Sequence, residues 1–355
     1  MHLNQIETMM TYNKRMMAMA AAALLAYHAT AQERSTFNVS LFGNVDTLRG
    51  AQINVISGVT NKEMRGVSIA GLLASSKGKS YGVQISGGLN SVDGNMRGLQ
   101  MAGVANIAHY ANGVQIAGLS NACTSPMRGI QISGITNIAM GVKRGIQLSV
   151  VANVCSEYMR GIQTAMYNYA DTLNGWQWGV INACMSHPRG VQVGLINYSR
   201  DTIAHKVGLV NVNPLTRIDV MAGGGTSTKT NVSLRFRNRS TYSIIGFGTH
   251  FMGFDDDFSG ALFYRLGQYV MLGQRWSLSG DVGYCHVETF KKNSNDGPKR
   301  LCSLQVRLNV DYSINKTLGA YASVGYGDTR YYHHFSKYRQ RMMGEAGLTF
   351  RLARK

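Results

Sequence analysis

One short phrase, written over and over between Gly50 and Asn213, constrains the fold of this chain more than any other feature. The phrase runs glycine, apolar residue, Gln, apolar residue, small residue, and an Asn follows a few positions later. Spaced 16, 15, 16 and 16 residues apart, its clearest copies begin at Gly82, Gly98, Gly113, Gly129 and Gly145. Self-similarity at a fixed spacing identifies an internal repeat in which every copy builds the same structural unit.

Within each copy, side chains alternate with a period of two. Ile130 and Ile132 fall on one face, whereas Gln131 and Asn137 fall on the other. This period is typical of a β-strand and argues against an amphipathic helix. Each copy is therefore predicted to form one strand of about nine residues followed by a turn.

Such a strand could be one rung of a β-solenoid or one stave of an antiparallel barrel. The turns favour the barrel. Every second turn ends alike, as at Met64-Arg65 and Met96-Arg97, and the turns between them end differently. The resulting period of about 32 residues suits an up-and-down meander, whose successive turns lie at opposite ends of the sheet. A solenoid with two strands per coil has the same period and stays the alternative.

The N-terminus carries the features of an export signal. Lys14 and Arg15 precede an apolar run at 16–27, and Ala29-Thr-Ala31 has the small-x-small form that signal peptidase cuts. The run of about 12 apolar residues is well short of the ~20 that a membrane-spanning helix needs. Residues 1–31 are therefore predicted to be a secretory signal peptide.

The chain is strongly basic, with a formal net charge of +18. High positive charge raises the question of nucleic acid as a partner. The export signal and the scattering of basic residues over turn ends argue against nucleic acid. Anionic lipid is the better match, so outer-membrane lipid is the expected partner.

From Arg217 onward the phrase disappears, but strand alternation continues with more aromatic residues. We expect eight strands, near 217–222, 230–237, 241–251, 258–272, 276–288, 300–314, 317–328 and 342–352. Short turns alternate here with longer polar loops, which is typical of an outer-membrane barrel whose short turns face the periplasm. No Pro- or Ser-rich linker separates this half, residues 214–355, from the repeat region, residues 32–213.

The repeat would contribute twelve strands to these eight. The sequence therefore predicts an all-β fold, an antiparallel up-and-down transmembrane β-barrel of about 20 strands. The alternative is a β-solenoid followed by an eight-stranded barrel. In the barrel, Val114, Ile116, Ile130 and Ile132 would contact hydrocarbon. In the solenoid they would form a packed core.

The run Gly113-Val-Gln-Ile-Ala-Gly-Leu-Ser-Asn121 and its copies resemble a family of bacterial surface repeat-containing proteins. The half from Asn231 to Lys355, ending in Gly347-Leu-Thr-Phe-Arg-Leu352, resembles outer-membrane β-barrels of Gram-negative bacteria. Together the two resemblances cover almost all of the chain after the signal. They imply a location in the cell outer membrane and an architecture, but no reaction or ligand.

The repeated amides are the first candidate functional residues. In a barrel they share the lumen face, where they could line a permeation path or form a ladder that holds the strands in register. The set comprises Gln84, Gln100, Gln115, Gln131, Gln147, Asn90, Asn106, Asn121 and Asn137.

Two further groups of residues could carry contacts or covalent bonds. Tyr331, Tyr332, His333 and His334 make an aromatic, basic loop that could touch glycans, small solutes or a partner, or could be an ordinary exposed loop. Cys285 and Cys302 flank the loop between two neighbouring strands and could form a disulfide.

Three more cysteines, Cys123, Cys155 and Cys184, recur at one kind of turn. In a meander these turns lie about 10 Å apart, too far for a bridge. In a solenoid with coils of 32 residues the three thiols would stack.

No Ser/His/acid set, carboxylate pair or metal-binding spacing rises above chance, so neither an enzyme, a cofactor nor a metal site is predicted. Two functions remain. One is a porin-like channel or structural envelope protein. The other is a surface-displayed repeat that acts in adhesion or partner binding and is anchored by a C-terminal barrel.

Overall fold

The computed structural model describes residues 32–186, 190–200, 205–251, 258–290, 299–332 and 337–352. The predicted signal peptide, residues 1–31, lies outside the described residues and stays a prediction. The chain divides into two compact units, the first ending at Gly161 and the second beginning at Ile162. Within the described residues, the first unit holds the coils of the repeat up to Gly161, and the second holds the last copies and the C-terminal half.

The described residues are organised as β-strands. In the repeat these are β1 (Gln32–Ala70), β2 (Leu73–Ser76), β3 (Lys79–Ser86), β4 (Leu89–Ala102), β5 (Ala105–Ala117), β6 (Ser120–Cys123), β7 (Met127–Ser133), β8 (Thr136–Ala139), β9 (Val142–Ser149), β10 (Ala152–Thr164), β11 (Tyr167–Ser186), β12 (Val191–Ser199), β13 (His205–Val207) and β14 (Val210–Val212). In the C-terminal half they are β15 (Arg217–Gly225), β16 (Thr228–Arg237), β17 (Thr241–Phe251), β18 (Phe258–Met271), β19 (Trp276–Phe290), β20 (Lys299–Ser313), β21 (Leu318–Tyr331) and β22 (Lys337–Arg351).

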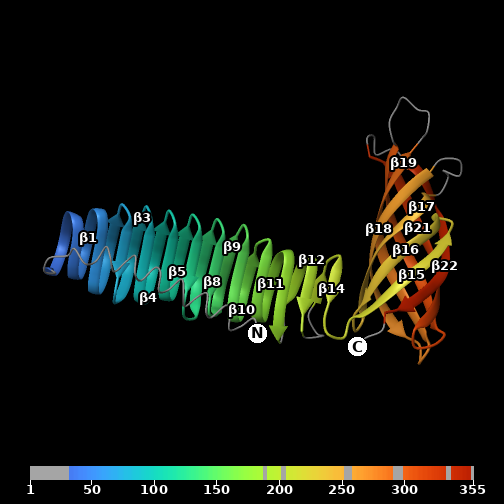
Figure 1. Ribbon diagram of the computed structural model, residues 1–355, viewed down its shortest axis with the longest axis horizontal. Helices are drawn as coiled ribbons and strands as arrows, with labels where there is room; N and C mark the ends of the chain where they lie inside the picture. The colour runs from blue at the N-terminus through green and yellow to red at the C-terminus, as the bar shows by residue number, and fades with distance from the viewer. Residues whose placement is uncertain are drawn as a thin grey trace. The chain divides into compact units, whose positions relative to one another are not determined.

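The repeat forms a parallel β-solenoid in which each copy of the phrase makes one coil. Gly82 pairs with Gly98, and Gly98 pairs in turn with Gly113, so identical positions of successive copies lie side by side. Each coil combines a short strand segment, such as β2, with a longer one, such as β3. Figure 1 shows these coils in the first unit as a regular series from β1 to β10.

The expected barrel of about 20 strands is wrong, and the alternative of a solenoid followed by an eight-stranded barrel is confirmed. The coil length also corrects the expected period of 32. Gln100 lies against Gln84, 16 residues earlier in the chain, so one copy closes one coil.

The doubled period comes from packing inside the coils rather than from two kinds of turn. Met64 lies beside Ser80, which lies beside Met96, and Met96 lies beside Ala111. Both methionines and their two small neighbours are buried. Alternating large and small side chains fills the interior without voids, because each long thioether occupies space that its small neighbours leave.

The glycine that opens each phrase is required by the backbone. Gly98 has φ +131°, and a Cβ placed there would lie 2.0 Å from the carbonyl oxygen of Gly82 in the preceding coil. Only glycine adopts this conformation without strain and allows backbones to approach so closely. The invariance of the phrase along the chain therefore follows from the stacking of the coils.

Amide ladders occupy the interior of the solenoid. Gln115 donates a hydrogen bond of 2.8 Å from Nε2 to Oε1 of Gln100, and Gln131 donates in the same way to Gln115. The asparagines run in the opposite sense, since Asn106 Nδ2 donates to Oδ1 of Asn121, the next copy, at 2.9 Å. Within the ladders these buried amides are satisfied by one another and by backbone carbonyls, such as that of Ile116, which accepts from Asn106 Nδ2 at 2.7 Å. Pairing of this kind is the condition for placing polar groups in a core.

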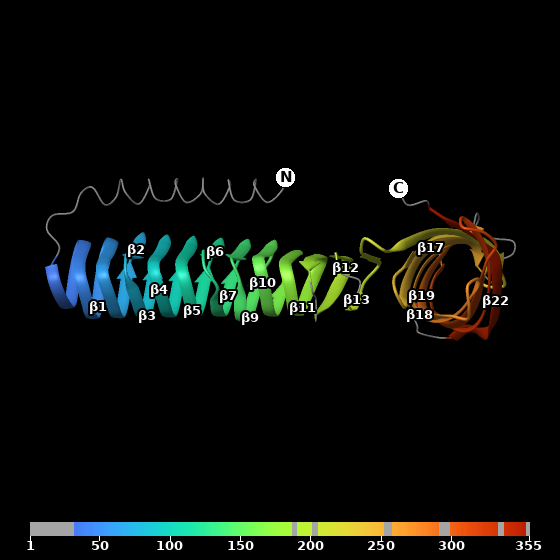
Figure 2. The ribbon, with the colours of Figure 1, turned by 90° about the horizontal axis from the view of Figure 1, so that it is seen from below.

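Strands β15 to β22 form a closed antiparallel barrel of eight strands, completed where β22 pairs with β15. Figure 2 shows it end-on as a ring. All eight strands begin and end within a few residues of the ranges expected from the sequence. In β20, Leu304, Val306 and Leu308 face outward and are exposed, whereas Arg307 and Asn309 face inward and are buried.

Candidate interaction surface and barrel interior

The outer face of the solenoid is apolar. The two residues that flank each repeated Gln point away from the interior and are half-buried or exposed; in the first unit they are Val83, Ile85, Leu99, Met101, Val114, Ile116, Ile130, Ile132, Ile146 and Leu148. They line up because successive copies pair in register, as Val114 does with Ile130. The result is two continuous columns of aliphatic side chains.

A third apolar column runs along the neighbouring corner of the coils. Backbone hydrogen bonds stack this corner directly, from the amide of Leu119 to the carbonyl of Val104 and from the amide of Ile135 to that of Leu119. Val104, Leu119 and Ile135 are 46%, 47% and 43% exposed. In the second unit, the residues flanking the corresponding Gln177 are Trp176 and Trp178, and both indoles are exposed. Contiguous apolar surface of this kind marks an interaction site.

Arginines form one edge of this surface. In register order the column reads Arg65, Tyr81, Arg97, Asn112, Arg128 and Arg144. The Arg65 and Arg97 guanidinium carbons lie 5.4 Å and 5.9 Å from the centre of the Tyr81 ring, in cation–π contact. Arg65 is paired with Glu63 at 2.9 Å, whereas no ion pair among the described residues involves Arg97, Arg128 or Arg144. The surface is therefore both apolar and cationic, and we call it the apolar–arginine face.

Two expectations about the apolar residues need correction. Ile130 and Ile132 belong neither to the wall of a 20-stranded barrel nor to a packed solenoid core, because they lie on the outside of the coils. On this side of the coils the amides point inward and the aliphatic side chains point outward, while buried methionines and alanines fill the remaining interior. The predicted alternation of side chains is correct, but the aliphatic face was expected to form the solenoid core, and the amide face does so instead.

The nine candidate amides lie inside the solenoid and not in the lumen of the closed barrel. Gln84, Gln100, Gln115, Gln131, Gln147, Asn90, Asn106, Asn121 and Asn137 are at most 1% exposed. The permeation path proposed for them depended on the 20-stranded barrel. Their contacts are ladders that hold neighbouring coils in register.

The interior of the barrel carries ion pairs that the sequence analysis did not identify. Arg235 donates from Nη1 to Asp311 at 2.6 Å and from Nη2 to Asp219 at 2.9 Å. Arg217 also binds Asp219, through two hydrogen bonds of 2.6 and 3.0 Å. Inward-facing charges at alternate positions of β15, β16 and β20 are the sequence signal that could have indicated this network.

A second cluster of charges surrounds Glu345 on β22. Arg307 donates to its carboxylate, Tyr321 donates to it at 2.7 Å, and Arg265 lies 3.8 Å away. All four side chains are buried. Eight-stranded barrels have an interior just wide enough for side chains to fill, and this interior is filled by paired charges.

The expected disulfide between Cys285 and Cys302 is not formed, and both residues are free thiols. The strand register gives the reason. Cys285 lies opposite Ser303, and His286 lies opposite Cys302, so the two cysteines occupy adjacent rows. Neighbouring rows of a strand point to opposite faces, which places Cys285 inside the barrel and Cys302 outside.

Cys123 and Cys155 share a column but do not touch. Cys123 pairs with Ala139, and Ala139 pairs with Cys155, so one coil separates the two thiols. Two coil steps amount to about 9.6 Å, beyond the reach of a disulfide. The thiols were expected to stack if one coil contained 32 residues. One coil contains only about 16 residues, so the cysteines fall in every second coil.

Burial should make these two thiols inert. It raises the pKa of Cys123 to about 11 and that of Cys155 to about 12. In a variant that keeps only these two cysteines, we expect no reaction with a disulfide reagent at pH 8 until the chain is unfolded, as measured by thiol titration. Because the folded pKa lies above the ordinary thiol value of 9.0, the thiols contribute stability that is lost as pH rises from about 9 through the folded pKa. Rapid labelling of folded protein at pH 8 would contradict the assigned burial.

Only part of the predicted aromatic loop can be placed. His333 and His334 lie outside the described residues. Tyr331 closes β21, and the Tyr332 hydroxyl contacts the hydroxyl of Tyr284 and lies 3.1 Å from Nδ1 of His286. A glycan-binding role for the loop stays a prediction. Among the described residues, no group of three or more His, Cys, Asp or Glu side chains could hold a metal ion.

The fold defines a two-part all-β protein, a parallel β-solenoid followed by a closed eight-stranded barrel. No protein-family model and no curated protein matches the chain. No helix in the described ranges is long and apolar enough to span a membrane.

Similar solved structures are themselves barrels. The N-terminal β-barrel domain of Pseudomonas aeruginosa OprF is 11% identical, with 39% of this chain and 96% of that chain covered and a TM-score of 0.30. Neisserial surface protein A is 11% identical over 39% of this chain and 94% of its own, with a TM-score of 0.27. A de novo designed transmembrane β-barrel is 12% identical, with coverages of 39% and 94% and a TM-score of 0.23.

Proposed function

We propose that the eight-stranded barrel anchors the chain in an outer membrane and that the repeat adheres, through the apolar–arginine face, to an anionic lipid surface. The observation that carries the proposal is that face itself, three aliphatic columns edged by arginines. Apolar area supplies the favourable free energy of burial, and arginines near an anionic surface add about 1 kcal/mol each.

The barrel suits the role of an anchor. Its outward positions are occupied by aliphatic and aromatic side chains such as Phe247, Leu262, Val282 and Leu304, all at least half exposed to the surroundings. Closure satisfies every strand edge, which is the condition for crossing hydrocarbon with β-structure. The filled interior favours an anchor over a porin-like channel, because buried ion pairs occupy the space that a permeation path would need.

An acidic substitution on the apolar–arginine face tests the adhesive role. We expect the full chain, held in nanodiscs of neutral phosphatidylcholine, to bind added vesicles that contain phosphatidylglycerol. Ile132→Asp should weaken this binding at least tenfold, because a carboxylate in the middle of the face opposes both the apolar and the electrostatic contribution. Co-sedimentation with the vesicles measures the loss.

The matched control is Ser91→Asp, which adds the same charge on the outward side of the short strand segment. It should leave vesicle binding nearly unchanged. Equal loss in both variants would reduce the effect to net charge and reject a specific face. Failure of the unaltered chain to bind anionic vesicles at low salt would reject the adhesive role, while the barrel could still act as an anchor.

A further inference from the structure

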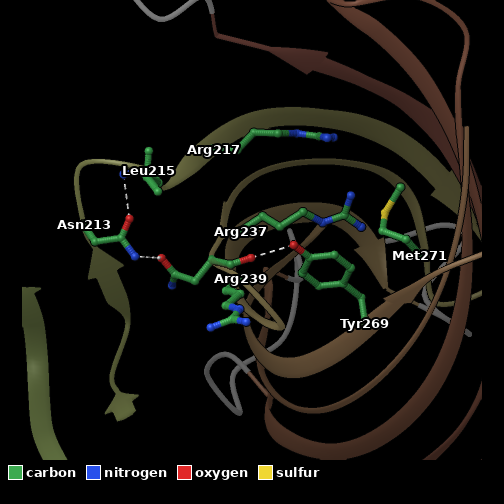
Figure 3. Close-up of a pocket in the computed structure, with 8 residues that line it drawn as sticks. Asn213, Leu215, Arg217, Arg237, Arg239, Tyr269 and Met271 are labelled. Carbon is green, nitrogen blue, oxygen red and sulfur yellow. Dashed lines mark hydrogen bonds between the residues drawn. The ribbon is translucent and has the colours of Figure 1, made fainter. Parts of the chain in front are cut away.

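The barrel end with the tight turns holds a cavity of about 460 Å³. It is lined chiefly by Arg217, Arg237, Arg239, Tyr269, Leu215 and Met271 (Figure 3). Arg217 starts β15, Arg237 ends β16, and Arg239 lies in the following turn. Tyr269 and Met271 come from the end of β18. This volume is within the range of small-molecule sites.

Positive charge exceeds negative charge around this cavity. Two carboxylates, Asp219 and Asp311, are shared among the guanidinium groups of Arg217, Arg235 and Arg237. Arg351 lies directly opposite Asp219 in the barrel register, and Arg239 adds a further exposed cation in the turn. Five arginines against two carboxylates leave an excess of three positive charges.

Part of that charge is buried and incompletely hydrogen-bonded. Arg237 is 5% exposed, and its Nη2 donates to Ser277 at 3.1 Å and to Asp311 at 3.2 Å. Its Nε is buried and has no hydrogen-bond partner within the described residues. An unpaired donor on a buried cation is costly, so an anion in the cavity would stabilise this side chain.

The chemistry of the lining selects the kind of anion. The Arg237 guanidinium carbon lies 4.2 Å from the centre of the Tyr269 ring, which fixes the plane of the guanidinium group. A fixed guanidinium fork matches the oxygen atoms of a phosphate group. Leu215 and Met271, 66% and 53% exposed, give the rim an apolar side that suits the glycerol and acyl part of a phospholipid.

We propose that this cavity binds a phosphate group, carried either by a phospholipid headgroup or by a free phosphate compound, through Arg237 and Arg239. The site is independent of the apolar–arginine face and needs no contact with the first unit. Tyr269 orients Arg237 for the anion and donates from its hydroxyl to the Asn238 carbonyl at 2.6 Å (Figure 3).

Calorimetric titration of the full chain in an uncharged detergent tests the site. The probes are inorganic phosphate and dihexanoylphosphatidylglycerol at matched ionic strength, with chloride as the reference anion. We expect saturable binding with one site per chain. Binding of the lipid at least tenfold tighter than phosphate identifies a headgroup site, whereas similar affinities identify a site for the phosphate group alone.

Two exposed turn arginines at this end provide a matched pair of variants. Arg239→Gln should weaken binding about tenfold, as expected for losing one charge-assisted contact of ~1.4 kcal/mol. Arg275→Gln, in the next turn and outside the cavity, should bind as the unaltered chain does. Both side chains are exposed, so neither substitution should prevent folding. The site is rejected if neither probe binds saturably, or if both variants lose affinity equally.

Discussion

Gly98→Ala is expected to unfold the solenoid locally and to lower its stability by about 3 kcal/mol or more. Gly98 has φ +131°, and its added Cβ would meet the carbonyl oxygen of Gly82 at 2.0 Å. Two costs therefore combine: a backbone conformation that L-residues avoid and a contact with backbone that cannot rotate away. Relief requires neighbouring coils to separate, which would stretch the bonds between Gln84 and Gln100.

The matched control for this variant is Asn95→Ala, three residues earlier in the same coil. Asn95 is exposed, so its removal should leave stability nearly unchanged. Hydrogen exchange of the repeat amides, followed by mass spectrometry, measures both variants. Protection of the neighbouring coils should fall in Gly98→Ala alone. Unchanged protection in that variant would contradict the close stacking of the coils.

Glu345→Ala should destabilise the barrel by about 3–5 kcal/mol, because it leaves two buried arginines without their counter-charge. Arg307 donates to this carboxylate and Arg265 lies 3.8 Å from it, both inside the barrel. The Tyr321 hydroxyl loses its acceptor as well. Urea-dependent refolding into lipid vesicles, followed by the heat-modified mobility of the barrel on gels, measures the loss.

The control for Glu345 is Glu288→Ala. Glu288 binds Arg300 at 3.0 Å on the surface, where solvent screens the pair. Its removal should shift the refolding midpoint little. Equal shifts in the two variants would mean that the interior charges are solvated, as in an open channel, and would revive the porin-like function.

The strand pattern of the chain could be predicted from the sequence, but the way in which the repeat closes could not. Alternation places amides on one face and aliphatic residues on the other in a lipid-facing barrel and in this solenoid alike. One signal was available in the constant position of Gln in every copy. Parallel stacking places each Gln beside the next, whereas antiparallel neighbours reverse direction and separate them.

In the later copies, the number of residues between Gly and Asn does not predict correctly whether the Asn side chain points inward or outward. Asn follows the opening glycine by one residue fewer at Asn168 than at Asn106. In a continuous strand this shift would turn the side chain outward. Asn168 is nevertheless fully buried, and its Nδ2 donates to Oδ1 of Asn182 at 2.9 Å. The shortening falls in the corner between strand segments, where one residue can be lost without changing the face.

The barrel interior was missed for a different physical reason. Alternation indicates which residues of β15 to β22 share a face, but it cannot say which charges meet. Arg307 and Glu345 are 38 residues apart and become partners only through closure and strand register. Strand register likewise prevents a disulfide between Cys285 and Cys302, which was predicted because both flank the same loop.

Thiol labelling of the reconstituted protein tests the division into a membrane anchor and an aqueous repeat most directly. Single cysteines replace Asp93, in an exposed corner of the repeat, and Val306, on the outer face of β20, in a background without the native five. The protein is placed in phosphatidylcholine vesicles, and a charged reagent is given access to both sides. We predict labelling at position 93 and protection at position 306, with both positions labelled after denaturation. Labelling at 306 as fast as at 93, or protection at both, would contradict the account.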